Sequence, residues 1–219
     1  MSYHVLMIVP TAGHVHVRNA AFCEYQAMRQ KEPLEVNGIP LSICSSKAID
    51  CPVDYNRNQA VSMFLAKGSW THLFFLDSDV EPPLDAIDRL LALEAPVATG
   101  LYPLMLREGL RWAVLNKDAG GVYRCRKALD FVDAPFQVDG AGAGCLLIRR
   151  DILSDMSWPY FRWDLTAPGR KTGEDVFFSK KLNASGVRIT VDPTVLCKHY
   201  KEIDLLQLMQ VKAEESYAA

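Results

Sequence analysis

Short apolar runs alternate with amphipathic stretches along the first hundred residues. The apolar runs cover residues 5–9, 39–44, 72–76 and 97–100, and each is too short for a helix, so we expect buried strands. Between them, residues 14–30, residues 56–67 and a stretch ending near Leu93 carry apolar side chains at helical spacing. Strands that alternate with helices predict a parallel sheet covered by helices on both faces.

The second half of the chain has a different pattern. Residues 112–116 and 122–126 flank a Lys-Asp-Ala-Gly-Gly sequence that is typical of a hairpin turn. An apolar strand is expected at 145–148 and a helix at 172–186. Further extended segments are expected at 131–136, 187–191 and 194–198, and a closing helix at 203–212.

Composition fits one folded α/β domain. The chain has 219 residues, of which 49% are apolar, enough for a full core. Its net charge of −2 argues against a surface that coats DNA non-specifically. The six cysteines form no C-x-x-C pair, which argues against a structural zinc site. The chain starts with a strand pattern instead of a signal peptide, and no apolar run reaches the about 20 residues of a membrane span, so we expect a cytoplasmic protein.

Asp77-Ser78-Asp79 directly follow the apolar strand 72–76. Ligands of open α/β sheets bind beyond the carboxyl ends of the strands. Two carboxylates at that place can hold Mg²⁺ or Mn²⁺, which take oxygen ligands and share them with substrate phosphates. The alternative is that these acids cap the helix introduced by Glu81-Pro82-Pro83.

Two glycine-containing segments are further candidates. Residues 140–145 alternate glycine with alanine before an apolar strand, where glycine lets a ligand approach the backbone; a tight turn is the alternative. Gly173-Glu174-Asp175 begin a helix. A carboxylate there can act as a general base, and a capping box from Thr172 to Asp175 is the alternative.

Two single residues complete the set. His199 follows an extended run, and a neutral imidazole is either a metal ligand or a structural residue. Arg57 lies near the start of a helix just after Asp54, a place that suits a phosphate or a carboxylate partner. The alternative for Arg57 is a surface ion pair with Asp54.

In this order and spacing, the motifs resemble the GT-A fold glycosyltransferases, most closely the large family two of inverting enzymes with its viral and bacterial relatives. The resemblance extends over residues 3–200, and its most specific pieces are 74–80, 140–150 and 173–178. It implies a GT-A, Rossmann-like mixed sheet flanked by helices in a single domain, 1–219. Within that domain, a nucleotide-binding half (1–100) would precede an acceptor-binding half (101–219).

The resemblance also implies roles for the candidates. Asp79, Asp77 and His199 would hold Mn²⁺ or Mg²⁺ against the donor diphosphate. Asp175 would be the base that deprotonates the acceptor, with Glu174 beside it. The donor itself would be bound by Pro10, Thr11, Ser45, Arg57, Asp77, Ser78, Asp79, Gly142, Ala143 and Gly144. Arg57 would lie close to the diphosphate or to Asp77.

The implied function is metal-dependent transfer of a sugar from a nucleotide sugar, expected to be a UDP-sugar, to a hydroxyl group with inversion. The acceptor is left open among a glycan, a lipid-linked sugar, a protein and a modified DNA base, because residues 109–136 match no known pattern. Trp158, Tyr160 and Trp163 are candidate stacking surfaces for a sugar, and residues 164–171 are a candidate mobile loop.

Three other protein classes are alternatives to a glycosyltransferase. A sugar nucleotidyltransferase would carry a basic loop after the first strand, where this chain has Pro10-Thr11-Ala12-Gly13-His14. A haloacid-dehalogenase-like phosphatase would have Thr or Val where this chain has Glu81. A non-catalytic sugar-nucleotide-binding module would keep only the scaffold, and the presence of Asp79, Asp175 and His199 argues against it.

Overall fold

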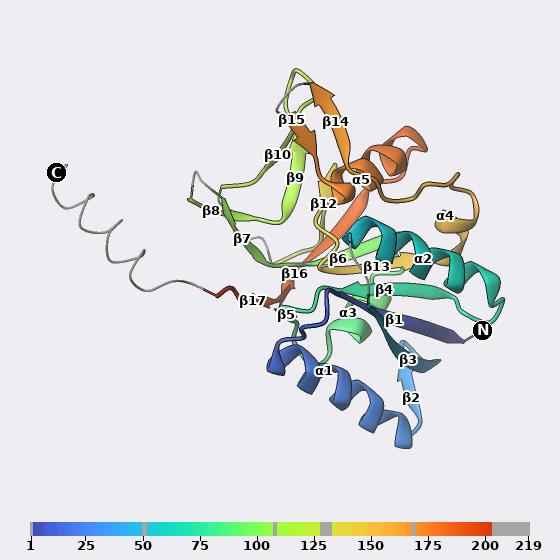
Figure 1. The fold of residues 1–219 in the computed structure, drawn as a ribbon. Coiled ribbons are helices and arrows are strands. Elements are labelled where there is room, and N and C mark those ends of the chain that lie inside the picture. The colour runs from blue at the N-terminus through green and yellow to red at the C-terminus, as the bar shows by residue number, and fades with distance from the viewer. Residues whose placement is uncertain (1, 50–51, 107–108, 128–132, 168–169, 203–219) are drawn as a thin grey trace, which may run out of the picture.

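The computed structural model describes residues 2–49, 52–106, 109–127, 133–167 and 170–202. Within these residues, eight strands form a mixed sheet in the order β11-β16-β6-β13-β4-β1-β3-β2 (Figure 1). These strands are β1 (Tyr3–Thr11), β2 (Leu34–Val36), β3 (Ile39–Ile49), β4 (His72–Leu76), β6 (Val97–Leu101), β11 (Phe136–Val138), β13 (Cys145–Arg149) and β16 (Ile189–Leu196).

Helices cover both faces of the sheet, as Figure 1 shows. One face carries α1 (Val17–Met28) and α3 (Ala86–Ala92). The other face carries α2 (Val53–Ala66), α4 (Arg150–Ser154) and α5 (Glu174–Ala184). A short 3₁₀ helix, Arg29–Lys31, extends α1. No helix in the described ranges is long and apolar enough to cross a membrane.

The central strand β4 is apolar at its last four positions because both of its faces are buried. Successive side chains of a strand point to opposite faces of the sheet. Leu73 and Phe75 belong to the core under α2, α4 and α5, while Phe74 and Leu76 belong to the core over α1 and α3. All four side chains have no exposed surface. A strand buried on both faces therefore brings its carboxyl end, and Asp77, to a fixed place.

The sheet is mixed, because β13 lies antiparallel between β4 and β6. The alternation of strands and helices predicts a parallel sheet, and β1, β3, β4 and β6 do run in one direction. A later segment nevertheless separates β4 from β6. Since β13 is apolar on both faces, it fits only a central position, and its reversed direction places the glycine run before it at the carboxyl ends of its neighbours.

Smaller antiparallel sheets lie beside the main sheet. They pair β9 (Val114–Lys117) with β10 (Tyr123–Cys125) and β12 (Gly140–Ala141), β7 (Pro103–Leu106) with β8 (Gly109–Trp112), β14 (Asp164–Ala167) with β15 (Arg170–Thr172), and β5 (Val80–Glu81) with β17 (Lys198–His199). The predicted hairpin turn after β9 is confirmed. The irregular loop expected at 164–171 is instead the β14–β15 pair, and its predicted mobility stays a prediction. The closing helix expected at 203–212 lies outside the described residues.

Candidate active site

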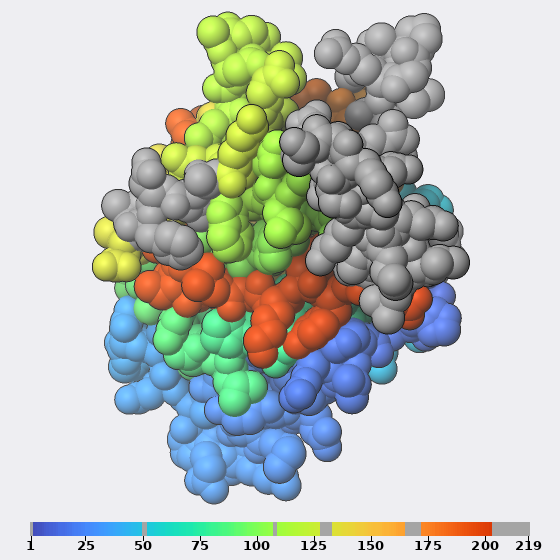
Figure 2. All heavy atoms as spheres, turned by 90° about the vertical axis from the view of Figure 1, so that its left-hand side faces the viewer, coloured from blue at the N-terminus to red at the C-terminus, as the bar shows by residue number. Residues whose placement is uncertain are grey.

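A cavity of about 400 Å³ opens at the carboxyl ends of β1, β4 and β6, and we call it the donor cavity. It gathers predicted site residues from distant parts of the sequence, namely Pro10, Thr11, Arg57, Asp77, Ser78, Asp79, Ala143, Glu174, Asp175 and His199. Sequence reasoning missed other lining residues, among them Asn56, Tyr102 and Lys201. Figure 2 faces this side of the molecule, where the red segment ending near residue 202 lies between green atoms above and blue atoms below.

Hydrogen bonds from the start of α1 fix the turn that carries the two aspartates. The backbone N–H of Val80 donates to the Asp77 carbonyl at 3.0 Å. The buried amide of Asn19 donates to the carbonyls of Asp77 at 2.8 Å and of Val80 at 2.9 Å. The backbone N–H of His16 donates to the Ser78 carbonyl at 2.8 Å. These bonds fix where the carboxylates point without using the carboxylates themselves.

Arg57 is buried at the back of the donor cavity, with 2% of its surface exposed. Its Nη2 lies 2.7 Å from Asp77 Oδ1, and its Nη1 donates to the Ala143 carbonyl at 3.2 Å. Its Nε lies 3.5 Å from Glu174 Oε1. The guanidinium also lies over the ring of Phe75 at 5.2 Å. One arginine therefore ties together α2, the Asp77 turn, the glycine run and the start of α5.

Three alternatives from the sequence are wrong. Arg57 forms no surface pair with Asp54, because its guanidinium is buried against other acids. Asp79 caps no helix, since α3 starts only at residue 86. The capping box from Thr172 to Asp175 is absent, because the N-cap residue of α5 is Gly173, which has no side chain, and Asp175 Oδ1 accepts from the Val176 N–H at 2.7 Å.

Asp79 is held by the side chains of His199 and Lys201. Its Oδ2 lies 2.5 Å from the Lys201 ammonium and 3.3 Å from His199 Nε2. Burial alone would raise the pKa of Asp79, but the hydrogen bonds with His199 and Lys201 lower that pKa to about 2. The other ring nitrogen of His199, Nδ1, lies 2.7 Å from the Pro103 carbonyl. Asp79 is therefore ionised across the physiological pH range.

The Asp79–His199 pair fits two neighbouring ligands of a divalent cation. Adjacent ligands of an octahedral ion with bonds of about 2.1 Å stand about 3.0 Å apart, close to the 3.3 Å between these two atoms. A proton on Nδ1 donated to the Pro103 carbonyl leaves Nε2 free to coordinate a metal. Asp77 is turned toward Arg57 instead. No three His, Cys, Asp or Glu side chains in the described part of the chain surround a common cation position.

Glu174 and Asp175 enter the cavity from the first turn of α5. Burial, and then the negative charge of Glu174, raise the pKa of Asp175 to about 6. Glu174 itself lies against the Arg57 guanidinium. Asp175 therefore combines a position facing the cavity with a proton affinity suited to general-base chemistry near neutral pH.

Tyr102 explains two of the glycines before β13. A Cβ atom at Gly142 would lie 2.1 Å from the Tyr102 hydroxyl, and one at Gly144 would lie 2.8 Å from it. The Gly144 N–H donates to that hydroxyl at 3.0 Å. Neither glycine is among the residues that line the donor cavity, whereas Ala143 between them is. Close packing of the backbone against Tyr102 accounts for both glycines.

Gly142→Ala is expected to lower the free energy of unfolding by about 1–3 kcal/mol, because the new methyl group overlaps the buried Tyr102 hydroxyl. Urea denaturation measures the change. Gly68→Ala is the control, since nothing lies within 4 Å of its added Cβ. Adding Tyr102→Phe should restore part of the loss. Equal stability of the two alanine variants would contradict the packing argument.

Strand β1 contributes residues to the donor cavity, whereas the neighbouring strand β3 contributes none. Thr11 lines the cavity, and its hydroxyl donates to the His14 carbonyl at 2.5 Å and accepts from the Gly13 N–H at 3.1 Å. Thr11 thus shapes the loop after β1. Ser45 lies exposed on β3 beside Met7, and it is not among the residues lining the cavity.

A larger cavity, of about 820 Å³, lies at the opposite edge of the sheet, beside the amino ends of β1 and β4. Its arginines already have partners. Arg149 pairs with Asp151 at 2.7 Å, and Arg150 donates to carbonyls at the end of α2. The acidic and basic residues that carry the predicted chemistry all lie at the carboxyl edge instead.

The sequence matches no protein-family model and no curated protein. Among solved structures, the chain is similar to A197 from STIV, with a TM-score of 0.60 and 22% identity over 91% of this chain and 86% of that one. It is also similar to GalNAc-T7 with UDP, GalNAc and Mn²⁺, with a TM-score of 0.56 and 12% identity over 93% of this chain. The match covers 45% of the GalNAc-T7 chain. These likenesses and the mixed sheet show a GT-A-like fold.

Proposed function

We propose that the protein transfers a sugar from a nucleoside diphosphate sugar, expected to be a UDP-sugar, to a hydroxyl acceptor with the help of Mn²⁺ or Mg²⁺. One observation carries the proposal: the Asp79–His199 pair and the high-pKa Asp175 line the same cavity at the carboxyl edge of a GT-A-like sheet. The similar GalNAc-T7 structure holds UDP, GalNAc and Mn²⁺, which supports this choice of donor and metal.

The residues of the donor cavity would have different roles in binding the donor. Asp79 and His199 would hold the cation, which when bound neutralises charge on the leaving diphosphate. Arg57 orients Asp77 at the cavity wall through a contact of 2.7 Å. Pro10 and Thr11, at the end of β1, would contact the nucleoside, as nucleotides lie beyond strand ends in such sheets.

Lys201 occupies the place beside Asp79 that the cation would take. Its ammonium lies 2.5 Å from Asp79 Oδ2, while about half of its side chain is exposed. The side chain is long and flexible, so it can leave Asp79 and still reach into the cavity. There it would bind a diphosphate oxygen through a charge-assisted hydrogen bond.

Asp175 would accept the proton of the attacking hydroxyl. The α5 helix presents Asp175, whereas Asp79 comes from the turn after β4, so base and leaving group are held by separate elements. That separation suits attack on the face of the anomeric carbon opposite the diphosphate, hence inversion, as in family two. Glu174, held by Arg57, would contact the acceptor beside Asp175.

Calorimetric titration of UDP tests the donor site. Wild-type protein is expected to bind UDP at least about tenfold more tightly with Mn²⁺ than with EDTA, and Asp79→Asn should remove that difference. Glu81→Gln is the matched control, because Glu81 is a nearby acid outside the donor cavity. UDP affinity that is the same with Mn²⁺ and with EDTA would refute the metal-assisted donor site.

A further inference from the structure

A third cavity, of about 560 Å³, lies between α2 and residues 158–162, and we call it the α2 groove. The first turns of α2 separate it from the donor cavity. Val53, Asn56 and Arg57 line the donor cavity, whereas Asp54, Tyr55 and Asn58 line the groove. At 100° per residue these sets occupy opposite sides of the helix. A helix with side chains is about 10–12 Å across, so the groove lies about one helix diameter from the donor cavity.

Two large aromatic side chains in the α2 groove are exposed. Trp158 has 72% of its surface exposed and Tyr55 has 47%. The Tyr55 hydroxyl accepts a hydrogen bond from the Gln59 amide at 2.8 Å, which orients the ring. Exposed aromatic rings that are rimmed by polar groups mark binding sites on soluble proteins.

The wall that carries the exposed tryptophan is firmly attached. Asn58 Oδ1 accepts from the backbone N–H of Tyr160 at 2.9 Å, and its amide donates to the Phe161 carbonyl at 2.6 Å. The Lys181 ammonium donates to the Pro159 carbonyl at 2.7 Å. Bonds from both α2 and α5 therefore fix this segment, so that a ligand would meet a preorganised groove.

The polar groups of the groove favour a carbohydrate over a peptide. Asp54, Gln59 and Ser62 line the groove beside the aromatic rings and carry side-chain oxygens that can accept hydrogen bonds. A pyranose offers an apolar C–H face for aromatic rings and hydroxyl donors for a carboxylate. A proline-rich peptide also fits aromatic grooves, but proline has no N–H to donate to the oxygens that line this one.

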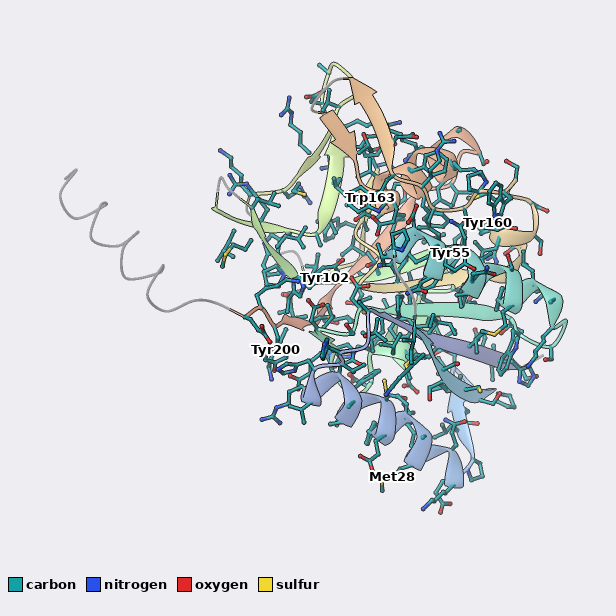
Figure 3. The ribbon with its side chains drawn as sticks, viewed as in Figure 1. Met28, Tyr55, Tyr102, Tyr160, Trp163 and Tyr200 are labelled. Atoms are coloured by element: carbon teal, nitrogen blue, oxygen red, sulfur yellow. The ribbon has the colours of Figure 1, made fainter. Side chains whose placement is uncertain are left out.

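We propose that the α2 groove binds the carbohydrate chain of a glycan acceptor, away from the sugar that reacts. The inference rests on the proposed glycosyl transfer. Trp163, 43% exposed, lies beside Gly173 at the start of α5, so aromatic side chains continue from the groove toward Asp175. Figure 3 shows Tyr55 and Trp163 on the side of the sheet that carries α2 and α5.

Calorimetric titration with maltohexaose, cellohexaose, chitohexaose and mannohexaose tests the proposal, without donor or metal. At least one hexasaccharide is expected to bind, and Trp158→Ala and Tyr55→Ala should each weaken that binding about tenfold or more. Tyr25→Ala is the matched control, because Tyr25 is a similarly exposed helix tyrosine on α1, outside the groove. Thermal melting of each variant shows that the fold is retained, as expected for exposed side chains.

The outcomes separate this proposal from the proposed function. Donor turnover combined with no binding of any hexasaccharide overturns the groove proposal alone. Hexasaccharide binding that Trp158→Ala and Tyr55→Ala leave unchanged also overturns it, as does groove-dependent binding of a decaproline peptide in place of the sugars. Groove-dependent sugar binding without any donor turnover keeps the groove as a carbohydrate site and refutes the transferase.

Discussion

Asp175→Asn is expected to lower the rate of UDP-sugar turnover by about 10²–10⁴-fold, the range that a general base contributes. The amide cannot take a proton from the attacking hydroxyl, whether that hydroxyl belongs to an acceptor or to water. UDP binding should stay within a fewfold of wild type, since Asp175 is not placed against the donor diphosphate. Release of UDP, followed with and without the substitution, measures the effect.

The pH profile adds a second readout for Asp175. The pKa of Asp175 is raised to about 6, so the carboxyl is protonated below that pH and ionised above it. Only the ionised form accepts a proton, and kcat/KM should therefore fall as the pH drops through about 6. Asp151→Asn, at the opposite edge of the sheet, is the control and should keep both rate and profile. A wild-type rate in Asp175→Asn would exclude Asp175 as the base.

Arg57→Met is expected to lower the free energy of unfolding by about 3–5 kcal/mol, the cost of removing one partner from a buried ion pair. Asp77 and Glu174 would then face the cavity without their cation. Arg124→Met is the control, because the exposed Arg124–Asp118 pair should contribute only about 0–1 kcal/mol. Urea denaturation at pH 7.5 compares the two variants.

The loss in Arg57→Met should shrink in acid. Arg57 lowers the pKa of Asp175, so its removal raises the folded-state pKa of Asp175 further above its unfolded value. A group with a raised folded pKa loses stability as the pH rises through that pKa, so the penalty grows from pH 5 to pH 7.5. A penalty that is equal at both pH values, or one as small as that of Arg124→Met, would contradict a charge-based role.

The sequence predicts best those residues of the donor cavity that lie at the end of a strand or the start of a helix with a clear local pattern. Residues 73–76 before Asp77 are all apolar because both faces of the strand are buried, so the end of the strand and the acids after it could be placed without a structure. The start of α5 and the hairpin after β9 could be predicted from their own local signals, the Gly173-Glu174-Asp175 sequence and the Lys-Asp-Ala-Gly-Gly turn. The proposed division into halves at residue 101 stays a prediction, and the cavity draws residues from both sides of it.

Long-range partners could not be predicted from local pattern, and only the resemblance implied that Arg57 lies near Asp77. Arg57 meets Asp77 and Glu174 only after three elements pack together, so its sequence neighbour Asp54 is a misleading guide. Tyr102 follows a buried strand as Asp77 does, a signal that could have found it. The position of β13 in the middle of the sheet depends on which strands it pairs with, and local spacing along the sequence carries no information about that pairing.

Nucleotide release from UDP-, GDP- and ADP-sugars, with Mn²⁺ or with EDTA, tests the central claim most directly, with wild type beside Asp79→Ala. We expect Mn²⁺-dependent release from one donor, expected to be a UDP-sugar, and loss of that release in Asp79→Ala, because Asp79 would hold the cation that neutralises the leaving diphosphate. No release from any donor, or release that neither EDTA nor Asp79→Ala reduces, would contradict a metal-dependent glycosyltransferase.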